Sequence, residues 1–260
     1  MRAALAGASF AGIGLLLASA SVGAAATLSE VKSGGALHVC ANPEGMPFTS
    51  QDPAVPGIQL ELAEAIARAL GTKPRVSWVY GPRAVRLAGC EVLMSAVGSA
   101  ESRGPVRLTR PYFGTGYVLL RPRGTDGAKS FEELRGQKIG VQVQSVAQWV
   151  LTKRGLTTTP TITPEEVIEK VLTGEAAAGA IPAALAAWYL KQHPTAPLEI
   201  ADVYVTDPEL RWNVAVGLRN ADQALADAVN QILQDLLRDG SIESTFSRYG
   251  VRYHDPFPGE

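Results

Sequence analysis

The chain lacks an excess of charge of either sign. Its 24 Lys and Arg residues nearly balance 25 Asp and Glu residues, and the formal net charge is −1 at pH 7. The sequence also has no basic run and no alternation of basic and aromatic residues. Proteins that bind nucleic acids normally carry such a basic surface, so the composition argues against a nucleic-acid partner.

Metal-binding and catalytic motifs are missing as well. The three histidines, His38, His193 and His254, are far apart and show no metal-ligand spacing, and the two cysteines do not form a Cys-x-x-Cys pair. The sequence contains no phosphate-binding loop and no Gly-x-Ser-x-Gly motif. We therefore expect no metal and no cofactor on this chain.

Only one long apolar stretch is present, and it lies at the beginning. A positive charge at Arg2, an apolar stretch over 3–22 and an Ala-rich end at 23–26 predict a secretory signal peptide, residues 1–26, cleaved near Ala26. The alternative is a membrane anchor, but a spanning helix needs about 20 strongly apolar residues, and this stretch is diluted by Ala, Gly and Ser. No cysteine follows for lipid attachment. We expect a periplasmic protein with no membrane anchor after cleavage.

The two cysteines, Cys40 and Cys90, both remain after this cleavage. An even count in an oxidising compartment favours a disulfide bond. The alternative is a pair of buried free thiols. We expect the bridge, which would stabilise the fold by closing a long loop.

Strand and helix patterns alternate along the mature chain. Residues 37–40, 75–80 and 91–97 predict strands, and a four-residue apolar spacing between the first two predicts a helix from Gly57 to Gly71. The order strand, helix, strand implies a parallel sheet with right-handed crossovers.

A polar stretch rich in Gly and Pro, 121–127, leads to a second unit of the same kind. Two capping boxes, at 130–133 and 163–166, indicate helix starts within it. Residues 213–218 predict a strand that returns to the first unit, followed by a long helix.

We therefore expect an α/β protein of two lobes. The first part of lobe 1 spans 27–115, lobe 2 spans 116–208, and 209–260 returns to lobe 1. Two crossings between the lobes make a hinge, and a ligand would bind in the cleft between them.

Several motifs occur in an order that resembles a known family. They are the stretch from Leu93 to Arg103 followed by LTRPYF at 108–113, the loop 42–48, KIGVQVQS ending at Ser145, and the Arg-Tyr-Gly at 248–250. Together they resemble the family 3 solute-binding proteins, which serve ABC transporters for polar amino acids. The resemblance covers nearly the whole mature chain. It implies the type II periplasmic binding protein fold, with two parallel-sheet lobes joined by a two-segment hinge.

The resemblance also implies ligand-binding residues. Arg103 matches the residue that holds the ligand's α-carboxylate, and a guanidinium group can donate two hydrogen bonds to it. Ser95 lies in the same stretch, Phe48 matches an aromatic wall, and Ser145 matches a helix start on lobe 2 that suits an anion. The alternatives are a surface arginine, a core phenylalanine and a helix-capping serine.

One position departs from the family pattern. Amino-acid binders place an Asp on lobe 2 to hold the ligand's ammonium group, and the matching residue here is Pro182. Proline has no side-chain acceptor, and a buried ammonium group without an acceptor is costly. The departure weighs against an ordinary amino acid as the ligand.

One branch of the family is more similar. The segments VCANPEGMPF, GCEVLMS, LTRPYFGTGYVLL and AIPAALAAWYLKQHPTAPLEI resemble the MxaJ/XoxJ type, the binding-protein-like accessory of methanol dehydrogenase operons. This resemblance implies a partner, a periplasmic PQQ-dependent alcohol dehydrogenase, that itself carries the PQQ. The cleft would then receive a peptide or a segment of that enzyme. The alternative is an ABC-transporter receptor for an amino acid or another small carboxylate, with the transporter permease as partner.

An enzyme is the second alternative, because one fold can serve several functions. A periplasmic dehydratase-like activity would need a carboxylate of tuned pKa in the cleft. Glu44 and Glu101 are the nearest candidates by position, and both also suit solvated loop charges. The sequence favours a protein without catalytic residues.

Overall fold

The computed structural model describes residues 26–98, 106–124 and 127–259. These residues form an α/β fold around a nine-stranded sheet in the order β4-β1-β5-β11-β6-β9-β7-β8, with β10 paired to β6. The expected signal peptide lies, except for Ala26, outside the described residues. Arg103 and Glu101 lie outside them as well.

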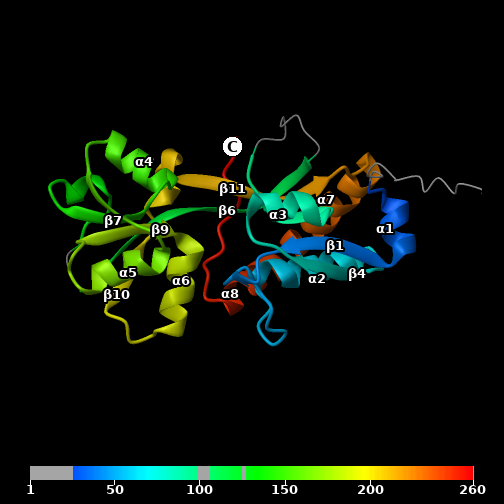
Figure 1. Ribbon diagram of the computed structural model, residues 1–260, viewed down its shortest axis with the longest axis horizontal. Coiled ribbons are helices and arrows are strands. Elements are labelled where there is room, and N and C mark those ends of the chain that lie inside the picture. Colours follow the sequence, from blue (N-terminus) through cyan, green and yellow to red (C-terminus); the bar gives the residue numbers. More distant parts are fainter. Residues whose placement is uncertain (1–25, 99–105, 125–126, 260) are drawn as a thin grey trace, which may run out of the picture.

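We call one end of the molecule lobe 1; it contains β1, β4, β5 and β11 with helices on both sides (Figure 1). Strand β1 is parallel to β4 and β5, as expected, whereas β11 returns antiparallel to β5. Its elements are α1 (Leu28–Gly34), β1 (Ala36–Ala41), β2 (Glu44–Gly45), β3 (Thr49–Ser50), α2 (Ile58–Ala69), β4 (Lys73–Trp78), α3 (Gly81–Ala88), β5 (Val92–Ala96), β11 (Arg211–Arg219), α7 (Gln223–Arg238) and α8 (Ser241–Arg248).

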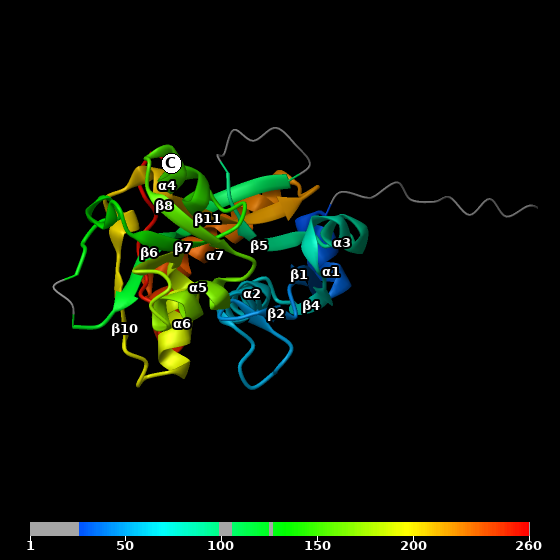
Figure 2. The same cartoon turned by 60° about the vertical axis from the view of Figure 1, so that its left-hand side comes forward.

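We call the other end lobe 2; in it β7 runs parallel to β8 and β9, and α4, α5 and α6 surround these strands (Figures 1 and 2). Its elements are η1 (Glu132–Leu134), β7 (Lys138–Gln142), α4 (Val146–Lys153), β8 (Thr157–Thr161), α5 (Pro164–Leu172), β9 (Ala178–Pro182), α6 (Ala183–Gln192), β10 (Leu198–Ala201), η2 (Val203–Val205) and η3 (Pro208–Leu210). The two capping boxes behave differently. Thr163 caps α5 through Glu166 N, whereas the box at Ser130 precedes only the short 3-10 helix η1.

Strand β6 (Val106–Pro122) belongs to both lobes. Its first part pairs with β11 up to Gly116, and from Tyr117 onward it pairs with β9 and β10 instead. Because one strand passes from the first sheet into the second, the two lobes are joined by regular backbone hydrogen bonding.

Each lobe has its own hydrophobic core. In lobe 1, α2, α7 and α8 pack on the sheet around fully buried Tyr112 and Phe246. In lobe 2, side chains that alternate along β6 enter two separate clusters: Leu119 packs with Phe131 and Leu151, while Leu120 packs with Val167. This follows from the two-residue period of a strand, which sends successive side chains to opposite faces of the sheet.

The chain crosses between the lobes a third time after α8. The irregular tail runs between them in Figure 1, and Phe257 is buried in the lobe 2 core. Asn213 on β11 donates to Phe257 O and accepts from Phe257 N, both at 2.8 Å. Gly114 N also donates to His254 O at 2.9 Å. Phe257, although it follows α8 of lobe 1, therefore packs on lobe 2.

Candidate functional site

A cavity of about 280 Å³ lies between the lobes. Most of its lining comes from β1, the 42–49 loop, α2, β5, β6 and β11, and lobe 2 contributes Pro182 and Ala184. Among the described residues that line it, none carries a charged side chain. The cavity therefore offers apolar contacts and neutral hydrogen-bonding groups.

Aromatic rings form one wall of the cavity. Phe48 lies 6.1 Å from Phe113 between ring centroids, and Phe113 in turn packs on Phe246 of the lobe 1 core. Gly57 holds the Phe48 loop close to α2: it has φ +99°, and a Cβ there would lie 2.5 Å from the Phe48 backbone. Only glycine fits both constraints, so the wall is fixed by the start of α2.

Neutral polar side chains complete the lining. Gln59, which is buried, donates to Met94 O at 3.4 Å, and Thr49 donates to Asn42 O at 2.7 Å. Ser95 is exposed at the cavity, and Thr115 lines it from β6. These groups can orient a solute by hydrogen bonds, but they offer no anion to pair with an ammonium group.

Two of the residues expected to bind a ligand, Phe48 and Ser95, line this cavity together. Ser145 does not: it is the N-cap of α4 on lobe 2, where its hydroxyl accepts from Gln148 N at 3.1 Å. Arg103 lies outside the described residues. The acid–base candidate Glu44 is exposed on β2 with Tyr80 as its hydrogen-bond donor, and it is not part of the lining.

Sequence reasoning missed Tyr117, which packs on the lobe 2 core beside the cavity. It packs edge-on against Trp212 of the cavity wall, with ring centroids 5.3 Å apart. Burial raises the pKa of Tyr117, and the nearby polar groups of Ser145, Val146 and Ala147 oppose part of this rise. The sequence pattern that could have identified it is its position two residues after Thr115, because alternate residues of a strand share one face.

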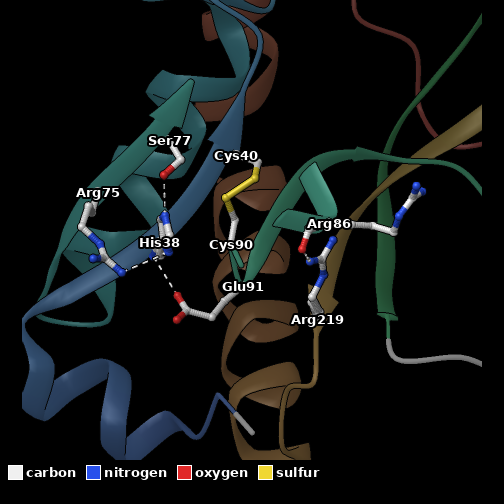
Figure 3. The surroundings of a disulfide bond; sticks show 8 residues. All are labelled: His38, Cys40, Arg75, Ser77, Arg86, Cys90, Glu91 and Arg219. Carbon is white, nitrogen blue, oxygen red and sulfur yellow. Dashed lines mark hydrogen bonds between the residues drawn. A yellow bond between two sulfur atoms is a disulfide. The ribbon is translucent and has the colours of Figure 1, made fainter. Parts of the chain in front are cut away.

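The expected disulfide bond is present. Cys40 at the end of β1 joins Cys90 just before β5, with the two Cα atoms 5.5 Å apart (Figure 3). Cys40 also lines the cavity, so the bridge fixes part of the wall.

Beside the bridge lies a buried histidine (Figure 3). His38 Nδ1 lies 3.0 Å from the Arg75 guanidinium, and Nε2 lies 2.7 Å from Ser77 Oγ. Since arginine can only donate, Nδ1 accepts and the ring is neutral. Burial and the Arg75 charge lower the pKa of His38, against the opposing effect of Glu91.

Within the described ranges, no group of three His, Cys, Asp or Glu residues is arranged to hold a metal ion. In the same part of the chain, none of the helices combines the length and apolar composition that a membrane span requires.

A family model for bacterial extracellular solute-binding proteins, family 3, matches residues 37–252. A probable amino-acid ABC transporter-binding protein of Haemophilus influenzae is 25% identical over 211 residues, which is 76% of this chain and 77% of that relative.

The fold is shared with solved structures of two-lobed binding proteins. An ancestral cationic amino-acid solute-binding protein aligns with a TM-score of 0.73 and 21% identity, over 86% of this chain and 99% of that one. The unliganded, open L-cystine receptor of Neisseria gonorrhoeae aligns with a TM-score of 0.72 and 17% identity, over 86% and 96% of the two chains. These neighbours are type II periplasmic binding proteins, which confirms the expected fold class.

Proposed function

This chain belongs to family 3 of the bacterial extracellular solute-binding proteins, and we propose that it is a non-catalytic periplasmic receptor of an ABC transporter. It is exported by a signal peptide cleaved near Ala26, binds a small solute in the cleft, and presents it to the transporter permease. The similarity to an amino-acid ABC transporter-binding protein supports the transport role.

The neutral lining of the cavity is the observation that defines the solute. Pro182 stands where the family resemblance expects an acidic residue, and no described residue of the lining supplies a carboxylate in its place. An ammonium group in this cavity would lose its hydration without gaining an anion. We infer a small carboxylate without an amino group, with Phe48 as its wall, Ser95 as a hydrogen-bond partner and Arg103 as its cation.

Closure of the cleft follows from the proposed lobe division, with 27–115 and most of 209–260 on one side and 116–208, together with Phe257, on the other. The strands that connect the lobes, β6 and β11, run next to each other and lie against the cavity. Bending at these strands would bring Pro182 and Ala184 onto a bound solute.

Thermal unfolding with matched solutes tests the proposal. The purified protein is heated with α-amino acids, with the corresponding 2-hydroxy or 2-keto acids, and with their amides. A solute at 100 times its dissociation constant should stabilise the folded protein by about 2.7 kcal/mol. We expect a shift with a deaminated acid and none with its amino acid.

Phe48→Ala should abolish that shift, whereas Val205→Ala, an exposed side chain of η2 outside the cavity lining, should retain it. Stabilisation by amino acids alone would contradict the proposed solute class. Unchanged stabilisation in Phe48→Ala would contradict the proposed site.

A second candidate is an accessory of a periplasmic PQQ-dependent alcohol dehydrogenase. It is favoured by exposed apolar side chains on the lobe 2 edge that faces the cleft. Val143 and Ile162 follow the ends of β7 and β8, which share that edge with Pro182 of β9, and Trp149 on α4 is 62% exposed. Exposed apolar patches commonly bind proteins.

Sedimentation of the purified protein with such a dehydrogenase tests this candidate. A complex that is lost in Trp149→Ala, in the absence of any stabilising small solute, would support it. Stabilisation by a small acid, with no complex at micromolar concentrations, would rule it out.

A further inference from the structure

Tyr249 at the end of α8 is a buried residue of lobe 1 whose hydroxyl makes two hydrogen bonds. The hydroxyl donates to Glu61 of α2 at 2.7 Å and accepts from the backbone N–H of Gly57 at 2.8 Å. Glu61 in turn is paired with the guanidinium group of Arg248. The hydroxyl therefore has a fixed direction and holds the residue at which α2 begins.

The start of α2 is bonded to the loop that carries the aromatic wall. The backbone N–H of Ile58 donates to Pro47 O at 2.9 Å. The next one, that of Gln59, donates to Phe48 O at 2.8 Å. Phe48 and Gln59 both line the cavity, so a displacement of Gly57 would move two side chains of the lining.

The ring of Tyr249 contacts lobe 2. Trp188 of α6 lies 6.0 Å from it between ring centroids, within the range of favourable aromatic pairs, and it packs against the lobe 1 core. Further along α6, Lys191 Nζ donates to Arg248 O at 2.5 Å, where α6 lies beside the end of α8 (Figure 1). Near its beginning, α6 contributes Ala184 to the cavity lining. One helix of lobe 2 therefore both borders the cavity and rests on Tyr249.

We propose that Tyr249 is a positioning residue of the solute site: its hydroxyl places the Phe48 wall through the start of α2, and its ring receives Trp188, so that docking of lobe 2 and placement of the wall are coupled. This rests on the proposed function for the existence of a solute, but not for the contacts of Tyr249. Withdrawal of α6 as the cleft opens would free the ring, and the wall would then be held less tightly. A solute would meet a loose wall in the open cleft and a fixed wall in the closed one.

Amide hydrogen exchange followed by NMR measures the placement of the wall without any solute. The exchange rates of the Phe48 and Gly57 amides are each divided by that of Ile66, in the middle of α2, so that a general loss of stability does not raise these ratios. In Tyr249→Phe, which keeps the ring and removes the hydroxyl, we expect both ratios to rise at least about tenfold. In Trp188→Ala, we expect both to rise at least about threefold.

The double variant tests whether the two side chains act on the same path. If Trp188 acts through the Tyr249 hydroxyl, the ratios in Tyr249→Phe/Trp188→Ala should exceed those in Tyr249→Phe by less than about twofold. Tyr189→Phe, which removes a hydroxyl from α6, and Gln192→Ala, which shortens an exposed side chain of the same helix, are the controls and should keep the wild-type ratios. Should Trp188→Ala not fold, Trp188→Leu keeps an apolar side chain at this position and is judged by the same results.

Unchanged ratios in Tyr249→Phe or in Trp188→Ala would overturn the proposal, as would full multiplication of the two effects in the double variant. For the acid that gives the largest thermal shift in the wild type, we expect the affinity to fall at least about tenfold in Tyr249→Phe. Unchanged affinity would overturn the role of Tyr249 and leave the proposed function intact. A protein that no solute stabilises, but whose ratios rise in both single variants, would refute the proposed function while supporting the role of Tyr249 in placing Phe48.

Discussion

The two lobes differ in the interaction that joins segments far apart in the sequence: a disulfide bond in lobe 1 and ion pairs in lobe 2. In lobe 1, the Cys40–Cys90 bond joins β1 to β5. In lobe 2, the end of α4 is joined to η3 by charge: Arg154 donates two hydrogen bonds to Asp207, at 2.5 and 2.9 Å, and two to Glu209, at 2.7 and 3.3 Å. Arg154 also reaches Glu132 of η1 at 3.0 Å.

The difference determines what each lobe is sensitive to. A disulfide bond acts mainly on the unfolded chain, so salt and mild acid leave it unchanged, while a reductant removes it. An ion cluster is screened by salt and weakened when its carboxylates are protonated. Hydrogen bonds from Arg154 hold the pKa of Glu209 below its usual value, so this contribution is present at neutral pH and is lost as the pH falls through that lowered pKa.

The largest expected effect comes from removing the covalent connection. The double variant Cys40→Ala/Cys90→Ala frees a loop with a sequence separation of 50, and the chain-entropy model gives a loss of about 4 kcal/mol in the free energy of unfolding. Denaturant titration with and without dithiothreitol measures it. The reductant should lower the denaturation midpoint of the wild type and leave that of the double variant unchanged. Equal midpoints for the two proteins in the absence of reductant would refute the stabilising role.

The tail tests whether the lobes are separate. Phe257 follows α8 of lobe 1 in the chain, but its ring packs in the lobe 2 core. Phe257→Ala removes that ring, and such truncations lower the free energy of unfolding by about 3 kcal/mol. Hydrogen exchange should accelerate in β9 and β10 more than in β1 and β4. Phe257→Leu, which keeps most of the volume, should cost about 1 kcal/mol. Equal acceleration in both lobes would show that they unfold as one unit.

Arg154→Met tests the ionic connection of lobe 2. It leaves Asp207, whose side chain is only 19% exposed, without this partner, and we expect a loss of about 2 kcal/mol. Adding salt should destabilise the wild type more than the variant. Arg238→Met is the control, because that guanidinium group is 71% exposed and should contribute less than about 0.5 kcal/mol. Similar losses for the two variants would contradict the comparison.

The smallest expected effect concerns an acid-sensitive point in lobe 1. Because the pKa of His38 is lowered in the folded protein, the neutral ring stabilises the fold above the unfolded-state pKa of about 6.5. This contribution is lost as the pH falls through the lower, folded-state pKa. The free energy of unfolding should therefore decrease on acidification from about pH 6.5 down to the folded-state pKa of His38, and less so in His38→Gln. Identical pH profiles would exclude His38 as the cause.

Much of the fold could be predicted because its signals are local. The strand at 37–40, the helix after Gly57 and the returning strand at 213–218 each depend on short apolar periods, and all are present. The capping box at Ser130 shows the limit of such local signals. Gly136 follows it with φ +86°, and only the short 3-10 helix η1 forms. The ligand-binding role of the expected site residues stays a prediction. Phe48 and Ser95 line the cavity, whereas Ser145 caps α4 outside the lining.

The sequence by itself determined the family, the alternation of strands and helices, and the pair of cysteines, because composition, periodicity and ordered motifs are properties of neighbouring residues. Only the tertiary structure decided that Arg154 joins α4 to η3, that Phe257 packs in the lobe 2 core, and that Tyr117 packs on Trp212. Each of these depends on contacts between segments far apart in the chain, which are fixed by packing and not by any local pattern.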